Sequence, residues 1–252
     1  MMGNWNRCLM LAQGKYVAYL HDDDLLNDNY LQEITKILTD KRYSDAGAVC
    51  AHPNIMRMDG QKPAQRTKIQ GLRSAVKKAV TSFRYLYRKP AEPLTPIMSV
   101  IMMGNIYRAP TCGAVFNKEA LMNDGGWAEE GYPAADWLTC LRFNQTHKVY
   151  FLRQKLGVYR LIKSLTLSVR TEEWAAAWLC VLCRKWQDER VNKFVARHKN
   201  MIAYLVTKTF PSENAAEICS VFGITLTKPS RLNEKLFRGY KRFYAIVHNI
   251  DW

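Results

Sequence analysis

An apolar run that ends in three consecutive aspartates constrains this sequence most. The run Val17–Leu20 has no polar break, and His21 separates it from the triplet Asp22–Asp24. An uninterrupted apolar run is typical of a strand that is buried on both faces of a sheet. Three adjacent carboxylates repel one another unless a positive group lies among them. The sequence therefore predicts a buried strand with an acidic turn at its carboxyl end.

The segments on either side of this strand have helical patterns. Residues 4–13 form one helical segment, which Gly14 closes. After the acids, Asn27 or Asp28 is in position to cap a second helix. Apolar side chains then recur at helical spacing, at Tyr30, Leu31, Ile34, Ile37 and Leu38. This order predicts an α/β fold, in which ligands bind at the carboxyl ends of strands.

Two interpretations of the acidic triplet remain open from the residues alone. Acids in a first helical turn are favoured by the helix dipole, so the triplet is explained by a solvated turn that caps the next helix. Closely spaced carboxylates also bind Mg²⁺ or Mn²⁺, and such an ion holds a substrate diphosphate. An EF-hand loop does not match, because its glycine and its distant glutamate are absent.

The composition indicates a globular protein that binds anionic partners. The chain has 252 residues, 48% of them hydrophobic, which is enough for one large domain or two small ones. Its 37 basic and 22 acidic residues give a net charge of +15, which favours nucleic acid, phosphorylated substrates or an anionic membrane. The seven cysteines lie mostly in apolar surroundings and form no evident disulfide framework. With no signal-peptide pattern and no apolar run of membrane-spanning length, these features predict a cytoplasmic protein.

A basic segment interrupts the α/β pattern. Residues 61–90 contain nine Lys or Arg and no acid. A solvated surface helix and an insertion that faces anions or a membrane explain this segment equally well. Three aromatic residues lie among its bases, which keeps a nucleic-acid-binding protein as an alternative function. They are Phe83, Tyr85 and Tyr87.

The remaining segments continue the alternation of strands and helices. Two strands are predicted at 46–52 and 54–61, the second closing on an Asp59-Gly60 turn. A strand at 112–116 precedes a helix at 117–124, which Gly125 and Gly126 end. A helix at 134–143 and two short strands within 147–161 follow. Residues 172–252 are predicted to be largely helical, with Ser212 capping one helix.

Four stretches resemble, in the same order, the glycosyltransferases of family 2, which have the GT-A fold. They are "GNWNRCLMLAQGKYVAYLHDDDLL", "GAVFNKEALMNDGGWAEE", "GYPAADWLTCLRF" and "GVYRLIKSLTLS". The first resembles the family's Asp-x-Asp region, the second the start of the acceptor side, the third the helix that carries the catalytic carboxylate, and the fourth a terminal Tyr-Arg…Ser stretch.

The resemblance implies an α/β fold with a GT-A-like (Rossmann-like) mixed sheet flanked by helices. This transferase domain would cover residues 1–170, with the basic insertion 61–90, and a mainly helical region would cover 171–252. Compared with the family, the opening strands that bind the nucleotide base are absent, about eighty to ninety residues for this fold class. The resemblance thus implies an N-terminally truncated domain whose sheet has an unpaired edge.

The resemblance also assigns the acidic turn to a nucleotide-sugar donor. Asp23 is the expected ligand of Mn²⁺ or Mg²⁺, with Asp22 as a second ligand. The neighbours Asp22 and Asp24 are expected either to share the metal or to face the sugar and ribose. The metal would stabilise the leaving diphosphate as a Lewis acid. His21 stands where the family has its first acid. Because histidine suits Mg²⁺ poorly and often only donates hydrogen bonds, we do not expect it to be a ligand.

Further residues are assigned by the other stretches. Asp136 is the expected general base, kept ionised by a helix N-terminus, and a plain N-cap aspartate is the alternative. Arg160 is expected either to face the diphosphate or to lie on a strand surface. Trp127 and Trp137 are expected near the acceptor, where an indole stacks on a sugar, although core packing explains at least one of them.

Together these features predict an inverting, metal-dependent glycosyltransferase. It would move a sugar from a nucleotide-sugar donor to a hydroxyl of a saccharide or lipid-linked acceptor. The basic segment and the net charge of +15 suggest a cytoplasmic protein that binds peripherally to the inner face of an anionic membrane. Surface polysaccharide synthesis is a process that takes place there. The alternatives are a basic nucleic-acid-binding protein, which the acidic turn disfavours, and a non-catalytic glycosyltransferase remnant.

Overall fold

The computed structural model describes residues 2–57, 91–95, 112–130, 133, 135–161, 171–209 and 212–247. Its N-terminal part contains α1 (Met2–Leu11), β1 (Tyr16–Ala18), β2 (Leu25–Leu26), α2 (Tyr30–Leu38), the 3-10 helix η1 (Lys41–Tyr43) and β3 (Ala46–Arg57). Then follow β4 (Ala91–Leu94), β5 (Ala114–Asn117), α5 (Lys118–Asn123), α6 (Ala135–Thr146) and β6 (Lys148–Leu161). The last part contains α8 (Thr171–Cys183), α9 (Glu189–Thr209), α10 (Ala215–Val221) and α11 (Arg231–Val247). The predicted basic insertion and the Asp59-Gly60 turn lie outside the described residues.

The strands form one mixed sheet in the order β1-β5-β3-β6-β2, with β4 also paired to β6. The long strands β3 and β6 run parallel, and β5 runs antiparallel to both β1 and β3. On its other side, β6 pairs first with β4 and then, nearer its carboxyl end, with β2. The carboxyl ends of β1, β3 and β6 therefore point toward the same edge of the sheet. This is the edge at which the acidic turn was predicted to bind a ligand.

Both long strands correct the sequence analysis, which expected two strands in each place. The pairing of β3 with β6 continues through register shifts around His52 and Pro53. Proline has no N–H to donate to a ladder, so an irregularity at this point is expected. The chain does not turn back there, because the strands remain paired on both sides of the shift. Each predicted pair of short strands is thus one long strand.

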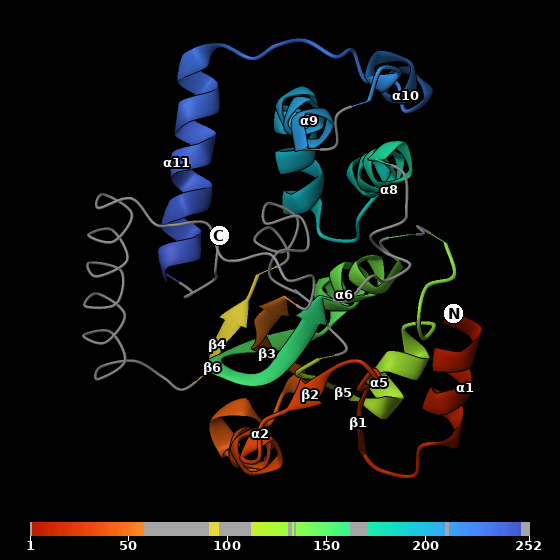
Figure 1. Cartoon of the computed structure of the whole chain (residues 1–252), viewed down its shortest axis with the longest axis vertical. Helices are drawn as coiled ribbons and strands as arrows, with labels where there is room; N and C mark the ends of the chain where they lie inside the picture. The colour runs from red at the N-terminus through yellow and green to blue at the C-terminus, as the bar shows by residue number, and fades with distance from the viewer. Residues whose placement is uncertain are drawn as a thin grey trace.

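Helices cover both faces of the sheet (Figure 1). Along β3, Ala48 and Cys50 belong to one buried cluster, while Val49 and Ala51 belong to the other. This period of two is that of a strand buried on both faces. The larger cluster joins the sheet to α1, α5, α6, α8 and α9, and the smaller one joins it to α2 and η1.

The first strand and its following helix differ in detail from the prediction. Only Val17 of the apolar run is buried, while Ala18 and Leu20 are exposed, since β1 lies at one end of the strand order. The N-cap of α2 is Asn29, which makes no side-chain cap bond. Asn27 instead donates a side-chain hydrogen bond to the carbonyl of Lys155 at 2.9 Å. The start of α2 is thereby attached to β6.

The predicted glycine end of α5 is confirmed, and the helix begins at a cap that the sequence analysis did not name. The side chain of Asn117 accepts a hydrogen bond from the backbone N–H of Ala120 at the start of the helix. Gly125 and Gly126 follow its end with φ values of 90° and 67°, a region that favours glycine.

The last third of the chain is helical throughout its described elements, as predicted. The cap of α10 differs from the prediction, which named Ser212. The N-cap residue is Asn214, and its backbone N–H donates a hydrogen bond to the hydroxyl of Ser212 at 3.1 Å. Among the described residues, no helix combines the length and the apolar character that a membrane span requires.

Candidate functional site

The acidic turn follows β1 directly and brings three potential metal ligands together. Ligand atoms of His21, Asp23 and Asp24 all lie within 4.8 Å of one another. The backbone N–H of Asp24 donates to the carbonyl of His21 at 3.2 Å, which closes the turn. Asp22 is exposed and does not belong to this group. The cluster therefore pairs Asp23 with His21 and Asp24, and not with Asp22 as the sequence analysis expected.

Asp24 is the buried member of the cluster, with only 3% of its surface exposed. Its Oδ1 accepts a hydrogen bond from the backbone N–H of Arg160 at 3.0 Å. Its Oδ2 is buried and has no hydrogen-bond partner among the residues that the structure describes. Burial raises the pKa of this carboxyl, the bond from Arg160 opposes the rise, and the charge of Asp23 adds to it. A buried carboxylate oxygen without a donor costs free energy, which a bound cation would offset.

The donor set decides which cation fits. Two carboxylates and one imidazole are ligands that suit Mn²⁺, whereas Mg²⁺ prefers oxygen ligands alone. The residues present thus fit a divalent metal, with Mn²⁺ preferred over Mg²⁺ if His21 takes part.

Arg160 holds the acidic turn from the carboxyl-terminal part of β6. Its Nε donates to the backbone carbonyl of Asp23, and its second guanidinium nitrogen donates to the carbonyl of Asp22 at 3.1 Å. Together with its backbone bond to Asp24, it contacts every residue of the triplet. The sequence analysis offered a diphosphate contact or a surface position. It missed this role because the partners are 136 or more residues apart and meet only through the pairing of β2 with β6.

Asp136 lies in the first turn of α6, as predicted. Its Oδ1 accepts from the backbone N–H of Trp137 at 2.8 Å, and the side chain is half-buried. Burial raises its pKa to about 6, although backbone hydrogen bonds lower it in part. The expected effect of the helix N-terminus is therefore outweighed by desolvation. A carboxylate with this pKa is ionised at pH 7 and is well suited to accept a proton.

Tyr159 connects the two groups of carboxylates. Its pKa is raised mainly by burial, and then by the negative charges of Asp24, Asp136 and Asp23. A charge shifts a pKa appreciably only at short range. The phenol therefore lies in the electrostatic field of both the candidate base and the acidic turn. The sequence analysis did not single out Tyr159, although it precedes Arg160 in the stretch that carries the resemblance.

Trp127 is a core residue in this structure. It is 1% exposed and makes edge-to-face contacts with Trp5, Tyr19 and Phe116 at centroid distances of 4.8, 5.0 and 5.6 Å. Trp5 in turn contacts the ring of His21 at 5.1 Å. With its surface covered, Trp127 presents no face on which a sugar can stack. It supports the acidic turn through Trp5 instead.

Trp137 differs from Trp127 in its exposure. It is half-buried, and its ring packs against those of Trp174 and Trp178 at 5.7 and 5.2 Å. Of the two indoles, Trp137 is the one that a ligand beside Asp136 could reach, because it follows Asp136 directly and is only half-buried.

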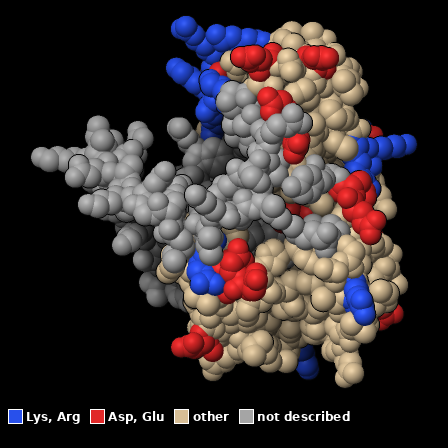
Figure 2. Space-filling view, turned by 45° about the vertical axis from the view of Figure 1, so that its right-hand side comes forward, with Lys and Arg blue, Asp and Glu red and all other residues tan. Residues whose placement is uncertain are grey.

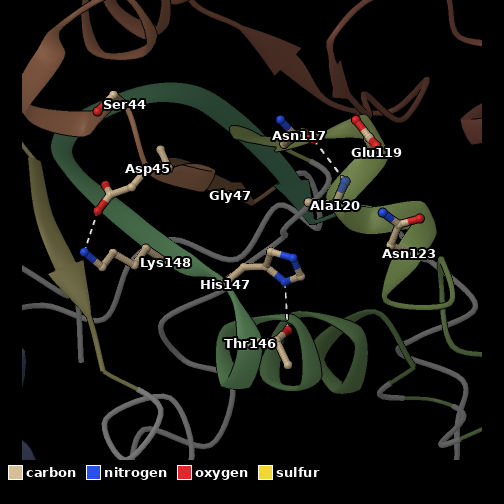
Figure 3. A pocket seen from close by; sticks show the side chains of 11 residues that line it. Ser44, Asp45, Gly47, Asn117, Glu119, Ala120, Asn123, Thr146, His147 and Lys148 are labelled. Atoms are coloured by element: carbon tan, nitrogen blue, oxygen red, sulfur yellow. Dashed lines mark hydrogen bonds and ion pairs between the residues drawn. The ribbon is translucent and has the colours of Figure 1, made fainter.

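A polar hollow of about 600 Å³ lies at the opposite edge of the sheet, where β3 and β6 begin (Figure 3). Its polar groups are largely paired with one another: Lys148 with Asp45, Thr146 with His147, and Asn117 with the backbone of Ala120. None of the predicted site residues lines it. The hollow is thus separate from the acidic turn.

The mixed sheet flanked by helices matches a GT-A-like fold. Among solved structures, the chain is similar to Staphylococcus aureus TarS, residues 1–349, in complex with UDP. The TM-score is 0.50 at 15% sequence identity, and the match covers 96% of this chain and 67% of that chain.

Two further structures of TarS 1–349 were compared. The complex with UDP-GlcNAc gives a TM-score of 0.47 at 15% identity, covering 96% of this chain and 68% of that chain. Another gives 0.48 at 13% identity, covering 98% and 60%. No protein-family model matches the sequence, and no curated protein matches it either.

Proposed function

We propose that this protein is an inverting, metal-dependent glycosyltransferase. It would move a sugar from a nucleotide-sugar donor to a hydroxyl of a saccharide or lipid-linked acceptor. The observation that carries the proposal is the cluster of His21, Asp23 and Asp24 at the carboxyl end of β1 in a GT-A-like fold. The UDP bound to the similar TarS structure supports a uridine nucleotide as the first donor to test.

Asp23, Asp24 and His21 are the residues that would hold Mn²⁺ in this proposal. The bound ion would supply positive charge that stabilises the leaving nucleoside diphosphate. Arg160 keeps the carbonyls of Asp22 and Asp23 in place, and so fixes the direction in which the neighbouring carboxylates point. Asp22 is exposed next to the cluster. Its proposed role is to accept a hydrogen bond from a ribose or sugar hydroxyl, and not to hold the metal.

Asp136 is the proposed general base. The hydrogen bond from the Trp137 N–H orients its carboxylate. The carboxylate takes the proton from the acceptor hydroxyl, whose oxygen then bonds to the anomeric carbon. The bond between that carbon and the diphosphate oxygen breaks on the opposite face, so the configuration inverts and the diphosphate leaves with the electron pair. Its pKa of about 6 matches this task near neutral pH.

The proposal includes a cellular location for the protein and a division of the chain into two regions. The net charge of +15 supports work at the inner, anionic face of a membrane in surface polysaccharide synthesis. Residues 1–170 would form the transferase domain and 171–252 a helical region attached to it.

The proposal is tested by calorimetric titration of Mn²⁺ with uridine or guanosine diphosphate into the full chain. We expect metal-dependent nucleotide binding that Asp23→Ala and Asp24→Ala abolish. Asp28→Ala is a matched control, because Asp28 is an exposed acid just beyond the cluster. Asp22→Ala should retain metal binding, and an equal loss with Asp22→Ala would favour the ligand pair Asp22 and Asp23 instead.

Other outcomes would contradict the proposal. Nucleotide binding that is unchanged by a chelator would remove the metal from it. Salt-sensitive binding to an oligonucleotide, without affinity for either nucleoside diphosphate, would favour the nucleic-acid-binding alternative. An absence of both activities would favour the non-catalytic remnant.

A further inference from the structure

Among the described residues, the last helix, α11, contacts the rest of the protein through the face that carries Phe237 and Glu234. The ring of Phe237 is buried and lies 6.3 Å from that of His198 in α9. Glu234 forms ion pairs with Lys208 of α9 at 3.4 Å and with Arg238 of its own helix at 2.7 Å. In Figure 1, α11 stands at the outside of the molecule beside α9, after an extended connection from α10.

A different face of α11 exposes large apolar side chains. Leu232 and Leu236 are 66% and 63% exposed. Four residues separate them, so they lie one above the other on the helix surface. The amino-acid sequence continues the same helical spacing with Tyr240, Phe243 and Val247. An exposed leucine alone needs no explanation, but two strongly exposed leucines stacked on one helix face indicate a surface that contacts an apolar partner.

Basic residues accompany this apolar stripe. Arg231 and Lys235 are both exposed on α11. Between residues 224 and 247, the sequence has six Lys or Arg and a single acid, Glu234, which is already paired. Figure 2 shows Lys and Arg side chains at the upper left, at the end of the molecule where α9, α10 and α11 lie, with several Asp and Glu side chains to their right. The exposed apolar face is therefore bordered by positive charge.

We propose that α11 is a membrane-docking helix that lies flat in the headgroup region of an anionic bilayer. A basic border beside an apolar stripe, on a helix of low overall hydrophobicity, is the pattern of interfacial helices. Leu232 and Leu236 would enter the acyl boundary, while Arg231 and Lys235 would contact lipid phosphates. The charge complementarity favours anionic lipid over a second copy of this basic chain. This inference rests on the proposed function only for its location at a membrane, and not for its chemistry.

The test is cosedimentation of the full chain with vesicles. One set contains equal parts of phosphatidylglycerol and phosphatidylcholine, and the other contains phosphatidylcholine alone. We expect binding to the anionic vesicles and at least about tenfold weaker binding for the double variant Leu232→Glu/Leu236→Glu. Val221→Glu is the matched control, because Val221 on α10 is 77% exposed and lies outside α11. It should bind as the wild type does.

A charge variant separates the two parts of the interaction. Lys235→Glu should weaken binding to anionic vesicles, and added salt should reduce the difference from the wild type. Lys185→Glu is the control, because Lys185 is also exposed but lies outside α11. This substitution should have little effect on binding to anionic vesicles. Thermal unfolding of every variant verifies that these surface substitutions leave the fold intact.

Three results would overturn the proposal. They are equal binding to both kinds of vesicle, full binding by the leucine double variant, and a concentration-dependent dimer that this variant abolishes without any vesicle binding. The last result would assign the face to a second copy of the chain. Nucleotide titration keeps the two proposals apart. If the wild type binds vesicles but no nucleotide, the transferase proposal fails and this one stands. The double variant should still bind nucleotide as the wild type does.

Discussion

Replacing Asp136 by asparagine should make the folded protein more stable at neutral pH while removing the proposed base. Burial raises the pKa of this carboxyl from 3.8 to about 6, a shift of about two units. Each unit corresponds to about 1.4 kcal/mol, so the penalty for the charged form is about 3 kcal/mol at most. Because the side chain is only half-buried, solvent screening reduces the expected gain to about 1–2 kcal/mol.

The sign and the pH range follow from the raised pKa. Below about pH 4 the carboxyl is protonated in both the folded and the unfolded chain, and it carries no penalty. As the pH rises through the folded pKa of about 6, the buried group becomes charged and the wild type loses this stability. Asparagine has no charge to bury. The difference in free energy of unfolding between the variant and the wild type should therefore be near zero below about pH 4 and largest above about pH 6.

Urea denaturation at a series of pH values from about 4 to 8 measures this difference. Asp188→Asn is the control of opposite sign, because Arg190 holds the pKa of Asp188 below its usual value. That variant should lose a small amount of stability at neutral pH, at most about 1 kcal/mol for an ion pair with an exposed arginine. The reasoning would be refuted if Asp136→Asn were less stable than the wild type at pH 7.5, or if its gain did not vary with pH.

The other predictions concern the support of the site and its activity. Sugar transfer should be lost in Asp136→Asn, and wild-type transfer should fall as the pH drops below about 6, as the pH–rate profile will show. Arg160→Met should weaken metal-dependent nucleotide binding about tenfold by calorimetry, because two carbonyls of the acidic turn lose their donor. Trp127→Ala should lower the free energy of unfolding by about 3–5 kcal/mol in urea. Gly126→Ala should lower it by about 1–3 kcal/mol, because φ is +67° and the added Cβ would lie 2.5 Å from Oδ1 of Asn6.

Elements that depend on local signals were predictable from the sequence. The helix α5 begins at an asparagine cap and is followed by a glycine pair, and both signals act within a few residues of the helix. The acidic turn lies at the end of its strand, as predicted, because a short apolar run ahead of polar residues is itself a local pattern. Asp136 lies in the first turn of its helix for the same reason.

Features that depend on distant partners were not predictable. Whether a β-rich segment is one strand or two is decided by the strand beside it, and β3 continues past Pro53 because β6 remains paired with it there. The burial of Trp127 requires Trp5, which is contributed by a separate helix. The direction of each carboxylate in the acidic turn follows from backbone geometry, so sequence position alone did not separate Asp24 from Asp22.

The end of β6 relates the two halves of the proposed reaction. Successive side chains of a strand point to opposite faces, so Tyr159 and Arg160 present different faces to their surroundings. Arg160 holds the carbonyls of the acidic turn, while the pKa of Tyr159 responds to the charges of both Asp24 and Asp136. Their positions are set by the pairing of Leu25 with Val158 between β2 and β6. A slip of one residue in this register would exchange the two faces, and the carbonyls of the acidic turn would lose the guanidinium of Arg160.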